Sequence, residues 1–337
     1  MTQSGQPASR AFDLQGHRGA RGLWPENTLA GFARTLALGV STFELDCAVT
    51  RDGVAVVSHD PQLNPDHTRD AQGRYLQAAG PRICTLDCAE LQQYDVGRIR
   101  PGTALAAEFP EQRAVDGERI PRLAELFTLV SRLGDSSVRF NIEVKLFPLQ
   151  PELTLAPEPF VRAVIEDVRN ARFASRVTIQ SFDWRVLRIV QELDPGIATG
   201  ALTDQQPGDD TVLGDQSGPS PWLGGLDIHD YQDSVPRLAK ASGAVHWSPH
   251  YLDLNAELVR EAQGLGLQVI PWTVNDPVDM RRIVSWGVDG MITDRPDHLR
   301  AVLRGLDLEV PSPVAAAATA TANPDRHDQS SCPDGRV

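Results

Sequence analysis

Thr42-Phe43-Glu44-Leu45-Asp46-Cys47 has the composition of a short buried strand, and it follows a stretch of helical period over 28–38. The same alternation of short apolar runs and amphipathic stretches recurs along the chain, which is typical of repeated βα units around a parallel sheet. We count eight such units. Eight units fit a closed (β/α)8 barrel, the TIM barrel, better than an open sheet, so the sequence predicts an α/β barrel fold.

The boundaries of these units follow from the apolar periods and from residues that start or stop helices. Strands are predicted at 12–16, 42–47, 140–144, 177–181, 198–202, 244–248, 268–273 and 290–293. The clearest helices are predicted at 28–38, 123–133, 159–169, 184–193, 256–265, 278–286 and 296–303. We expect Asn27 to cap the first helix and Gly39 to lie just past its end.

Two segments, 61–119 and 204–241, do not fit the repeat, because both are far longer than the ~2–6 residues of typical βα loops. Residues 54–57 can form an extra strand that leads to His59, so the first insertion begins beside the carboxyl ends of the strands. This insertion is interpreted either as a lid or small subdomain over that face of the barrel, or as a plain surface loop.

The composition is that of a globular protein, with 41% hydrophobic and 23% charged residues in a chain of 337. We expect one barrel domain over 11–310, which includes the 61–119 insertion, between disordered tails at 1–10 and 311–337 that contain few bulky apolar residues. The formal net charge of −13 argues against a nucleic-acid partner, since sequence-independent binding depends on a basic surface. The polar amino terminus and the lack of an apolar run of ~18 residues predict a cytoplasmic protein without stable membrane anchoring.

Carboxylates recur near the carboxyl ends of two predicted strands. Residues i and i+2 of a strand face the same side, so Glu44 and Asp46 point together, and Glu143 shares a face with Lys145. Inward carboxylates are costly to desolvate unless cations or protons compensate them, and a divalent ion would do so with Glu143 as a third ligand. Lys145 would then lie beside a phosphate site, where it could donate a hydrogen bond to a developing alkoxide. An internal ion pair of Lys145 with Glu44 or Asp46 is the alternative interpretation.

Two histidines lie at the ends of other early strands, His17 in His17-Arg18-Gly19 and His59 in His59-Asp60. A lone histidine in a strand is usually structural, but two at strand ends, one beside Arg18 and one beside Asp60, favour a reactive site. Cleavage of a phosphodiester requires a proton acceptor, a proton donor and positive charge at the phosphate. A phosphodiesterase is therefore the leading hypothesis.

Later strands also end in polar or aromatic residues. Gln180 is interpreted as a pocket residue, and Trp272 would either form a wall of the substrate pocket or pack in the barrel mouth. Asp294 is interpreted as a cap of the last helix, just before Pro296. No motif such as GxSxG places a Ser or Cys beside a His, so the chain offers no evident covalent nucleophile.

Taken together, these motifs resemble the glycerophosphodiester phosphodiesterase family, in order from about Leu14 to Leu303. The matching segments are His17-Arg18-Gly19, Pro25-Glu26-Asn27-Thr28, Glu44-x-Asp46, His59-Asp60, Glu143-x-Lys145, Gln180-Ser181-Phe182, Trp272-Thr273-Val274-Asn275 and Gly287-Val288-Asp289-Gly290-Met291-Ile292-Thr293-Asp294. The resemblance implies a TIM barrel with an insertion after the second strand. The roles that it implies are an acid/base pair of His17 and His59, ligands of Mg²⁺, Ca²⁺ or Mn²⁺ at Glu44, Asp46 and Glu143, and phosphate contacts from Arg18 and Lys145.

The resemblance implies hydrolysis of glycerophosphodiesters, such as glycerophosphocholine or glycerophosphoethanolamine, to sn-glycerol 3-phosphate and an alcohol through a cyclic phosphate. Two alternatives stay open: a lysophospholipase D-like enzyme for acylated substrates, and a non-catalytic phosphate-binding barrel. The chain departs from the family after His59-Asp60, where the usual Arg-Thr pair is replaced by Pro61-Gln62-Leu63-Asn64-Pro65-Asp66-His67-Thr68-Arg69. The preferred alcohol, the metal and the oligomeric state are not predicted.

Overall fold

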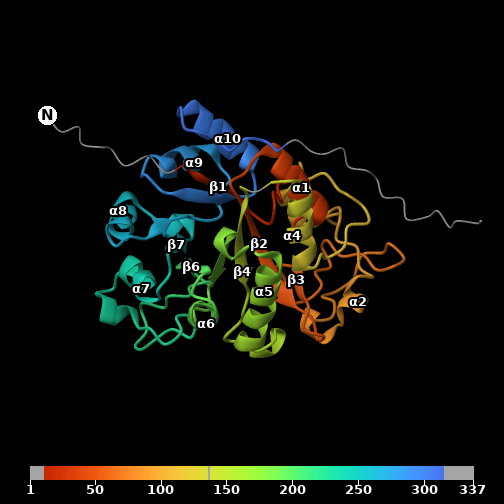
Figure 1. Cartoon of the computed structure of the whole chain (residues 1–337), viewed down its shortest axis with the longest axis horizontal. Coiled ribbons are helices and arrows are strands. Elements are labelled where there is room, and N and C mark those ends of the chain that lie inside the picture. Colours follow the sequence, from red (N-terminus) through yellow and green to blue (C-terminus); the bar gives the residue numbers. More distant parts are fainter. Residues whose placement is uncertain (1–10, 136, 315–337) are drawn as a thin grey trace, which may run out of the picture.

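The computed structural model describes residues 11–135 and 137–314, which form a barrel of parallel strands with helices around it (Figure 1). The strands are β1 (Asp13–Gly16), β2 (Thr42–Val49), β3 (Ala55–Val57), β4 (Arg139–Val144), β5 (Val177–Ser181), β6 (Ala198–Thr203), β7 (His246–Pro249), β8 (Gln268–Val269) and β9 (Gly290–Thr293). Their order in the sheet is β8-β7-β6-β5-β4-β2-β1-β9, and β3 pairs antiparallel with β2 outside that order. The predicted (β/α)8 barrel and the extra strand before His59 are confirmed.

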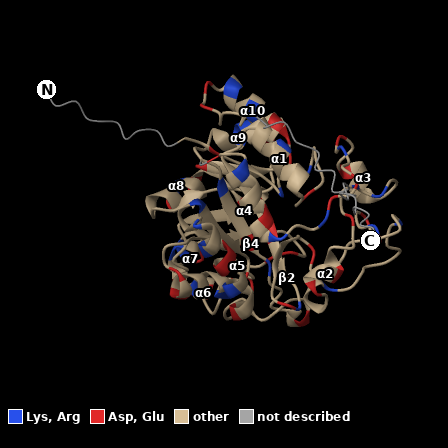
Figure 2. Ribbon diagram, turned by 45° about the vertical axis from the view of Figure 1, so that its right-hand side comes forward, with Lys and Arg blue, Asp and Glu red and all other residues tan. Residues whose placement is uncertain are grey.

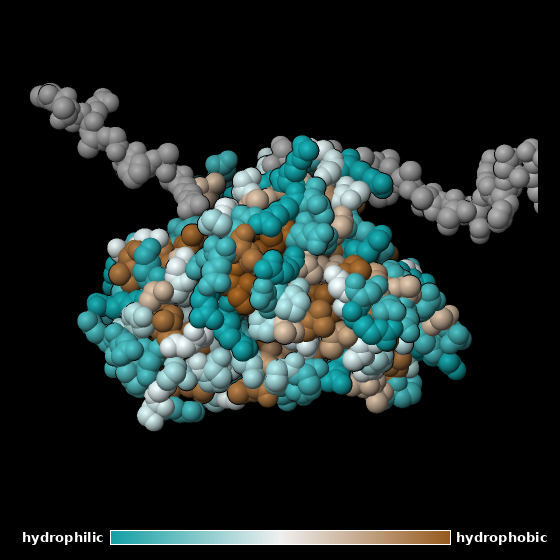
Figure 3. Space-filling view, turned by 60° about the horizontal axis from the view of Figure 1, so that its bottom comes forward, coloured by the Kyte–Doolittle hydropathy of each residue, from teal (hydrophilic) through white to brown (hydrophobic). Residues whose placement is uncertain are grey.

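Helices follow most of the barrel strands along the chain, as a βα repeat requires. They are α1 (Leu29–Leu38), α2 (Cys88–Leu91), α3 (Ala104–Glu108), α4 (Leu123–Arg132), α5 (Pro157–Ala171), α6 (Arg185–Leu193), α7 (Val235–Ala241), α8 (Ala256–Gly264), α9 (Pro277–Val284) and α10 (Pro296–Gly305). Figure 2 shows charged residues mainly on the outer faces of these helices and in loops. On the face shown in Figure 3, hydrophobic areas alternate with hydrophilic ones. None of the described helices combines the length and the apolar character that crossing a membrane requires.

The ring closes between β9 and the extended segment that continues β8. The amide of Asp289 donates to the carbonyl of Val269 at 3.0 Å, and the amide of Ile292 donates to the carbonyl of Pro271 at 2.9 Å. Val274 donates in turn to the carbonyl of Ile292 at 3.0 Å. Because Pro271 has no N–H, the regular ladder of β8 is shorter than the predicted 268–273 strand.

Side chains of β2 and β4 alternate between the helical layer and the barrel interior. Phe43 and Phe140 point outward, where Phe140 meets Phe127 of α4 edge-on with ring centroids 5.1 Å apart. The alternate residues of the two strands, Glu44 and Asp46 on β2 and Asn141 and Glu143 on β4, point inward. The parallel register sets Glu44 beside Asn141 and Asp46 beside Glu143, which brings three carboxylates to neighbouring positions. Packing of the aromatic layer thus determines which residues enter the interior.

The start of α1 corrects one expectation. Thr28, not Asn27, caps the helix, since its hydroxyl accepts the amide of Gly31 at 3.1 Å. The Asn27 side chain instead donates to a carboxylate oxygen of Asp46 at 3.1 Å. Gly39 ends the helix as expected, with a φ of 93° that favours glycine.

The two insertions are more ordered than their composition indicates. Segment 204–241 ends in α7, which the sequence reading missed; Ser234 caps this helix and Pro236 lies in its first turn, where a proline is tolerated. Segment 61–119 contains α2 and α3 and packs on β3 through a second apolar cluster. The members of that cluster are Ala48, Val56, Leu63, Ile83, Leu91, Val96 and Ile120.

Both predicted tails lie largely outside the described residues. Within the described part, residues 311–314 pack on the barrel, although they were assigned to a tail. The Arg300 guanidinium donates to the carbonyl of Pro311 at 2.6 Å, and the amide of Val314 donates to the carbonyl of Leu36 at 3.2 Å. The predictions for 1–10 and 315–337 stay predictions.

Candidate active site

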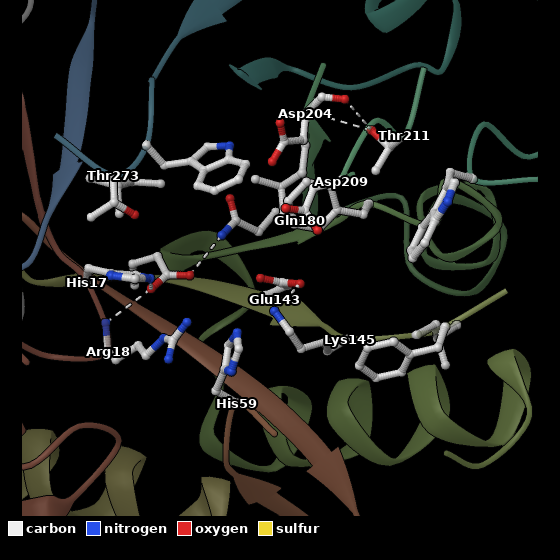
Figure 4. A pocket seen from close by; sticks show the side chains of 18 of the residues that line it. His17, Arg18, His59, Glu143, Lys145, Gln180, Asp204, Asp209, Thr211 and Thr273 are labelled. Atoms are coloured by element: carbon white, nitrogen blue, oxygen red, sulfur yellow. Dashed lines mark hydrogen bonds and ion pairs between the residues drawn. The ribbon is translucent and has the colours of Figure 1, made fainter. Parts of the chain in front are cut away.

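A cavity of about 460 Å³ lies at the carboxyl ends of the barrel strands (Figure 4). The predicted site residues that line it are His17, Arg18, Glu44, His59, Glu143, Lys145, Gln180 and Trp272. Asp46 is only 1% exposed and contacts this group through Lys145 and Arg18. Residues that are far apart in the sequence therefore meet at the barrel face where sites of this fold form.

Three buried carboxylates form a cluster beside this cavity. One carboxylate oxygen from each of Glu44, Asp46 and Glu143 lies within 4.8 Å of the other two. The Lys145 ammonium donates to Glu143 at 2.9 Å and to Asp46 at 3.4 Å, so part of the predicted internal ion pairing exists. Glu44 receives hydrogen bonds from the Gln180 amide at 3.0 Å and from the Arg18 backbone amide at 3.1 Å.

The charges of this cluster are not fully compensated by the protein. Burial, together with nearby Asp46 and Glu143, raises the pKa of Glu44 well above its ordinary value. Burial also raises the pKa of Glu143, although Lys145 opposes this shift. Asp46 has a lowered pKa, because Lys145 and other cationic neighbours outweigh its burial. Three oxygen donors at this spacing, with repulsion among them, suit a hard divalent cation.

His17 is held by a carboxylate that the sequence reading assigned to another role. Its Nδ1 lies 2.5 Å from Asp294, which also accepts from Arg21 at 2.7 Å and from the Asn275 amide at 2.6 Å. Asp294 therefore does not cap α10, whose N-terminus lacks a side-chain cap. Burial lowers the pKa of His17 even though Asp294 opposes the shift. The Nε2 atom of His17 faces Glu44 at 3.8 Å.

His59 has an equivalent arrangement at the end of β3. Its Nδ1 lies 2.8 Å from Asp60, and the Asn64 amide donates to the other oxygen of Asp60 at 2.7 Å. Burial and the cations Arg18 and Lys145 lower the pKa of His59 to about 4. Figure 4 shows His17 and His59 facing the cavity with Arg18 between them. Asn64 belongs to the stretch that departs from the family pattern, so this departure supplies a partner for Asp60.

Arg18 and its neighbours complete the cationic side of the site. The Arg18 guanidinium donates to Glu26 at 3.0 Å, and its Nε lies 3.3 Å from Asp46. Although burial alone would raise it, the pKa of Glu26 falls to about 2 because Arg18 and Arg21 are close. Glu26 was quoted only as part of a motif, and Asn27 was predicted to cap a helix. Their roles depend on side-chain directions that the spacing does not define.

The remaining cavity wall comes from apolar residues and from the loop after β6, residues 204–227. Trp272 lines the cavity, which agrees with one of the two placements considered for it, and its indole N–H donates to the carbonyl of Ser248 at 2.9 Å. Leu146, Phe147, Leu149, Phe182 and Trp222 also line it. Among the described residues, the lining includes 204, 208–211 and 222 of this loop and none of 61–119. A lid role for 61–119 stays a prediction.

Segment 61–119 does reach the loop after β1. The Gln112 side chain donates to the carbonyl of Arg21 at 2.7 Å, and the amide of Arg113 donates to the carbonyl of Leu23 at 2.9 Å. Glu111 pairs with Arg295, which follows Asp294. These contacts hold the loops after β1 and β9, which carry His17 and its partner Asp294.

Comparison with known proteins agrees with this geometry. Residues 17–298 match the model of the glycerophosphoryl diester phosphodiesterase family. A glycerophosphodiester phosphodiesterase from Caldanaerobacter subterraneus is 32% identical over 86% of this chain and 96% of its own length. A crystal structure of a Silicibacter pomeroyi protein assigned as a glycerophosphoryl diester phosphodiesterase has a TM-score of 0.80 and 36% identity, covering 90% of this chain and 97% of that one.

A more distant structure has the same fold. It is an Oleispira antarctica phosphodiesterase in complex with its product sn-glycerol-3-phosphate, with a TM-score of 0.63 and 22% identity over 87% of this chain and 96% of that one. The family match covers most of the barrel and includes the whole carboxylate cluster and both cavity histidines. This chain thus belongs to the glycerophosphoryl diester phosphodiesterase family and is a phosphoric diester hydrolase.

Proposed function

We propose that this enzyme hydrolyses glycerophosphodiesters of deacylated phospholipids to sn-glycerol 3-phosphate and an alcohol, with a divalent cation bound by Glu44, Asp46 and Glu143. The observation that carries the proposal is the pair of histidines, His17 and His59, each bonded to its own carboxylate and both lining one cavity. The Oleispira antarctica relative binds the product that this reaction would release. A barrel that only bound phosphate would have no need for two such imidazoles, which argues against the non-catalytic alternative.

The hydrogen bonds of the two histidines suit proton transfer. A carboxylate only accepts, so Nδ1 of His17 and Nδ1 of His59 each donate a proton, and both Nε2 atoms are free for chemistry. Their lowered pKa values make both imidazoles neutral near pH 7 in the free enzyme. A neutral imidazole can act as a base, and the negative charge of a bound phosphodiester would raise the pKa of the imidazole that acts as the acid.

The nucleophile in this proposal belongs to the substrate. One imidazole takes the proton of the glycerol C2 hydroxyl, whose oxygen then forms a bond to phosphorus. The bond from phosphorus to the alcohol breaks, and the other imidazole protonates the departing oxygen. Water then attacks phosphorus in the resulting cyclic 2,3-phosphate, and the bond from phosphorus to the C2 oxygen breaks, which leaves sn-glycerol 3-phosphate and restores the C2 hydroxyl. Well-oriented intramolecular attacks gain effective molarities of ~10⁵ M or more, which favours this route in a chain without a nucleophile motif.

Arg18 and Lys145 would bind the phosphate, since both are cations that line the cavity beside the carboxylates. Lys145 can also donate a hydrogen bond to an oxygen that gains negative charge. When bound, Mg²⁺, Ca²⁺ or Mn²⁺ would supply Lewis-acid polarisation of a phosphoryl oxygen. Gln180 holds Glu44 in place, and Asn27 holds Asp46, so the ligand oxygens are oriented before an ion arrives.

A lysophospholipase D-like activity is the second candidate, because the cavity has an apolar side. Leu146, Phe147 and Leu149 follow β4 along its wall, and Leu149 is 67% exposed. Such a row could contact an acyl chain, and exposed apolar patches often mark ligand grooves.

Release of choline separates the two candidates, since both reactions produce it. We expect faster choline release from glycerophosphocholine than from lysophosphatidylcholine at equal concentration, with sn-glycerol 3-phosphate as the second product of the first substrate. A higher kcat/KM for lysophosphatidylcholine would favour the lysophospholipase D-like function. Absence of turnover on both substrates, and on other glycerophosphodiesters, would reject the proposed function.

Substitution of either cavity histidine should remove one proton-transfer step. His17→Ala and His59→Ala are each expected to lower kcat by about 10²–10⁴-fold, the usual contribution of a general acid or base. Circular dichroism should be unchanged. His229→Ala is the matched control, because His229 is exposed and pairs only with surface groups. Near-normal kcat in either cavity variant would refute the assigned role of that histidine.

Removal of divalent cations should abolish turnover, because the carboxylate cluster would lack the charge that its three ligands are arranged to bind. EDTA treatment is expected to stop product release, and added Mg²⁺, Ca²⁺ or Mn²⁺ should restore it. Glu143→Gln should reduce the metal bound per protein in elemental analysis. Glu158→Gln on α5, an exposed carboxylate, should retain the wild-type amount. Full activity of metal-free protein would contradict the assignment.

Blocking the glycerol C2 hydroxyl should stop cleavage if the substrate supplies the nucleophile. A 2-deoxy analogue of glycerophosphocholine is expected to bind as a competitive inhibitor and to be cleaved very slowly. Rapid cleavage of the analogue would show instead that water attacks phosphorus directly. In that case the two histidines would act on water and on the leaving alcohol.

A further inference from the structure

The cavity has cationic side chains near one end and two further carboxylates at the other. Arg18 and Lys145 lie at the end that holds the carboxylate cluster, whereas Asp204 and Asp209 line the other end. Figure 4 shows Gln180 between these two groups. The charges of the second group come from the loop after β6, which none of the proposed chemical steps uses. This loop therefore has a function still to be assigned.

Asp204 is a buried carboxylate beside His250 and Asp253, and one nitrogen or oxygen atom of each of these three side chains lies within 4.8 Å of the other two. Its side chain lines the cavity although the residue is only 8% exposed, and one oxygen accepts the amide of Gln206 at 2.8 Å. In the described part of the chain, neither Asp204 nor Asp209 forms an ion pair. Burial raises the pKa of Asp204, and Asp253 and Asp209 add to that shift, although the Gln206 amide and His250 oppose it. A cation that entered this end would offset the cost of burying the Asp204 carboxylate and its repulsion by Asp253 and Asp209.

The loop that carries these carboxylates is held in its shape by its own hydrogen bonds. The amide of Thr211 donates to the carbonyl of Asp204 at 2.8 Å, and the amide of Asp204 donates to the Thr211 hydroxyl at 3.1 Å. The Ser220 hydroxyl fixes the carbonyl of Thr211 at 2.6 Å. Asp210 also lines the cavity, but one oxygen of its carboxylate accepts two backbone amides of the turn, whereas Asp204 accepts one. Asp204 and Asp209 are therefore the carboxylates of this loop with the most capacity to bind a ligand.

Aromatic rings line the cavity together with these carboxylates. The Trp272 ring is fixed by its hydrogen bond to Ser248 and by an edge contact with Phe182 at 5.4 Å. Trp222 belongs to the same loop as Asp204 and Asp209 and lines the same cavity. Aromatic faces attract ammonium groups, and quaternary ammonium ions in particular, by cation–π interaction. Carboxylates and indole rings in one cavity therefore favour a positively charged organic group.

We propose that Asp204 and Asp209, together with Trp272, form the subsite for the leaving alcohol and select an alcohol that bears an ammonium group over a neutral polyol. This inference rests on the proposed function. A phosphodiester of an amino alcohol is negative at phosphorus and positive at the alcohol. That order of charges matches the cavity from Arg18 and Lys145 to the loop after β6. The two aspartates are specificity-determining residues and take no part in proton transfer.

Substrates with and without a positive charge test the inference. Release of sn-glycerol 3-phosphate would be followed with glycerophosphocholine, glycerophosphoethanolamine and glycerophosphoglycerol, whose leaving alcohol is uncharged. The Asp204→Asn, Asp209→Asn double variant should lose about tenfold or more in kcat/KM on the two substrates whose alcohol bears an ammonium group, because a charge attraction beside aromatic rings is removed. Its kcat/KM on glycerophosphoglycerol should stay within about twofold of wild type.

Two further variants guard against a folding defect. Asp209→Lys reverses a charge at an exposed position and should also reduce the preference for alcohols that bear an ammonium group. Asp215→Asn is the matched control, an exposed carboxylate of the same segment that does not line the cavity. Equal losses on all three substrates, or no loss on any, would overturn the subsite. If the wild-type enzyme released sn-glycerol 3-phosphate from none of them, the proposed function would fail. Wild-type turnover without any preference for charge would reject the subsite alone.

Discussion

The placement of three carboxylates inside the barrel is the constraint on which the rest of the site depends. The register of β2 and β4 brings Glu44, Asp46 and Glu143 together, and a shift by one residue would send them into the helical layer. Such a cluster costs free energy unless it is compensated. Lys145, the Arg18 guanidinium and two side-chain amides supply part of that compensation. What is left uncompensated makes the cluster a good cation site and a poor structural element.

The two histidines depend on different parts of the fold. His17 follows β1, whereas its partner Asp294 follows β9, so their hydrogen bond forms only where the first and last strands of the ring pair. His59 and Asp60 are adjacent in sequence and follow β3, which lies outside the ring. Pairing of β1 with β9 therefore completes one half of the proposed acid/base pair, and β3 positions the other half. Segment 61–119 lines no part of the cavity, but its Gln112 contacts the loop after β1 and its Glu111 contacts the loop after β9. These are the two loops that carry His17 and Asp294.

The sequence predicted the features that follow from a strict period and missed those that depend on direction. Period two along two strands was enough to group Glu44 with Asp46 and Glu143 with Lys145. Asn27 and Asp294 were assigned as helix caps, because the residue types that cap helices are also those that orient ligands and imidazoles. The helix α7 was missed since Pro and Gly surround it. Asp204 directly follows β6, two residues after the cavity-lining Leu202, but the chain beyond it has no period, so no spacing argument could bring Asp209 to the cavity.

This division has a physical basis in the barrel itself. Strand ends are held by hydrogen bonds and by packing on both sides, so groups that must meet a reacting atom to within a fraction of an ångström belong there. Loops can change length and charge without disturbing that frame. In this chain the loop after β6 is stiffened by Thr211 and Ser220, so its carboxylates need little ordering when a ligand arrives. Stiffness costs adaptability, and a fixed negative end would therefore discriminate among alcohols where a flexible loop would accept them all.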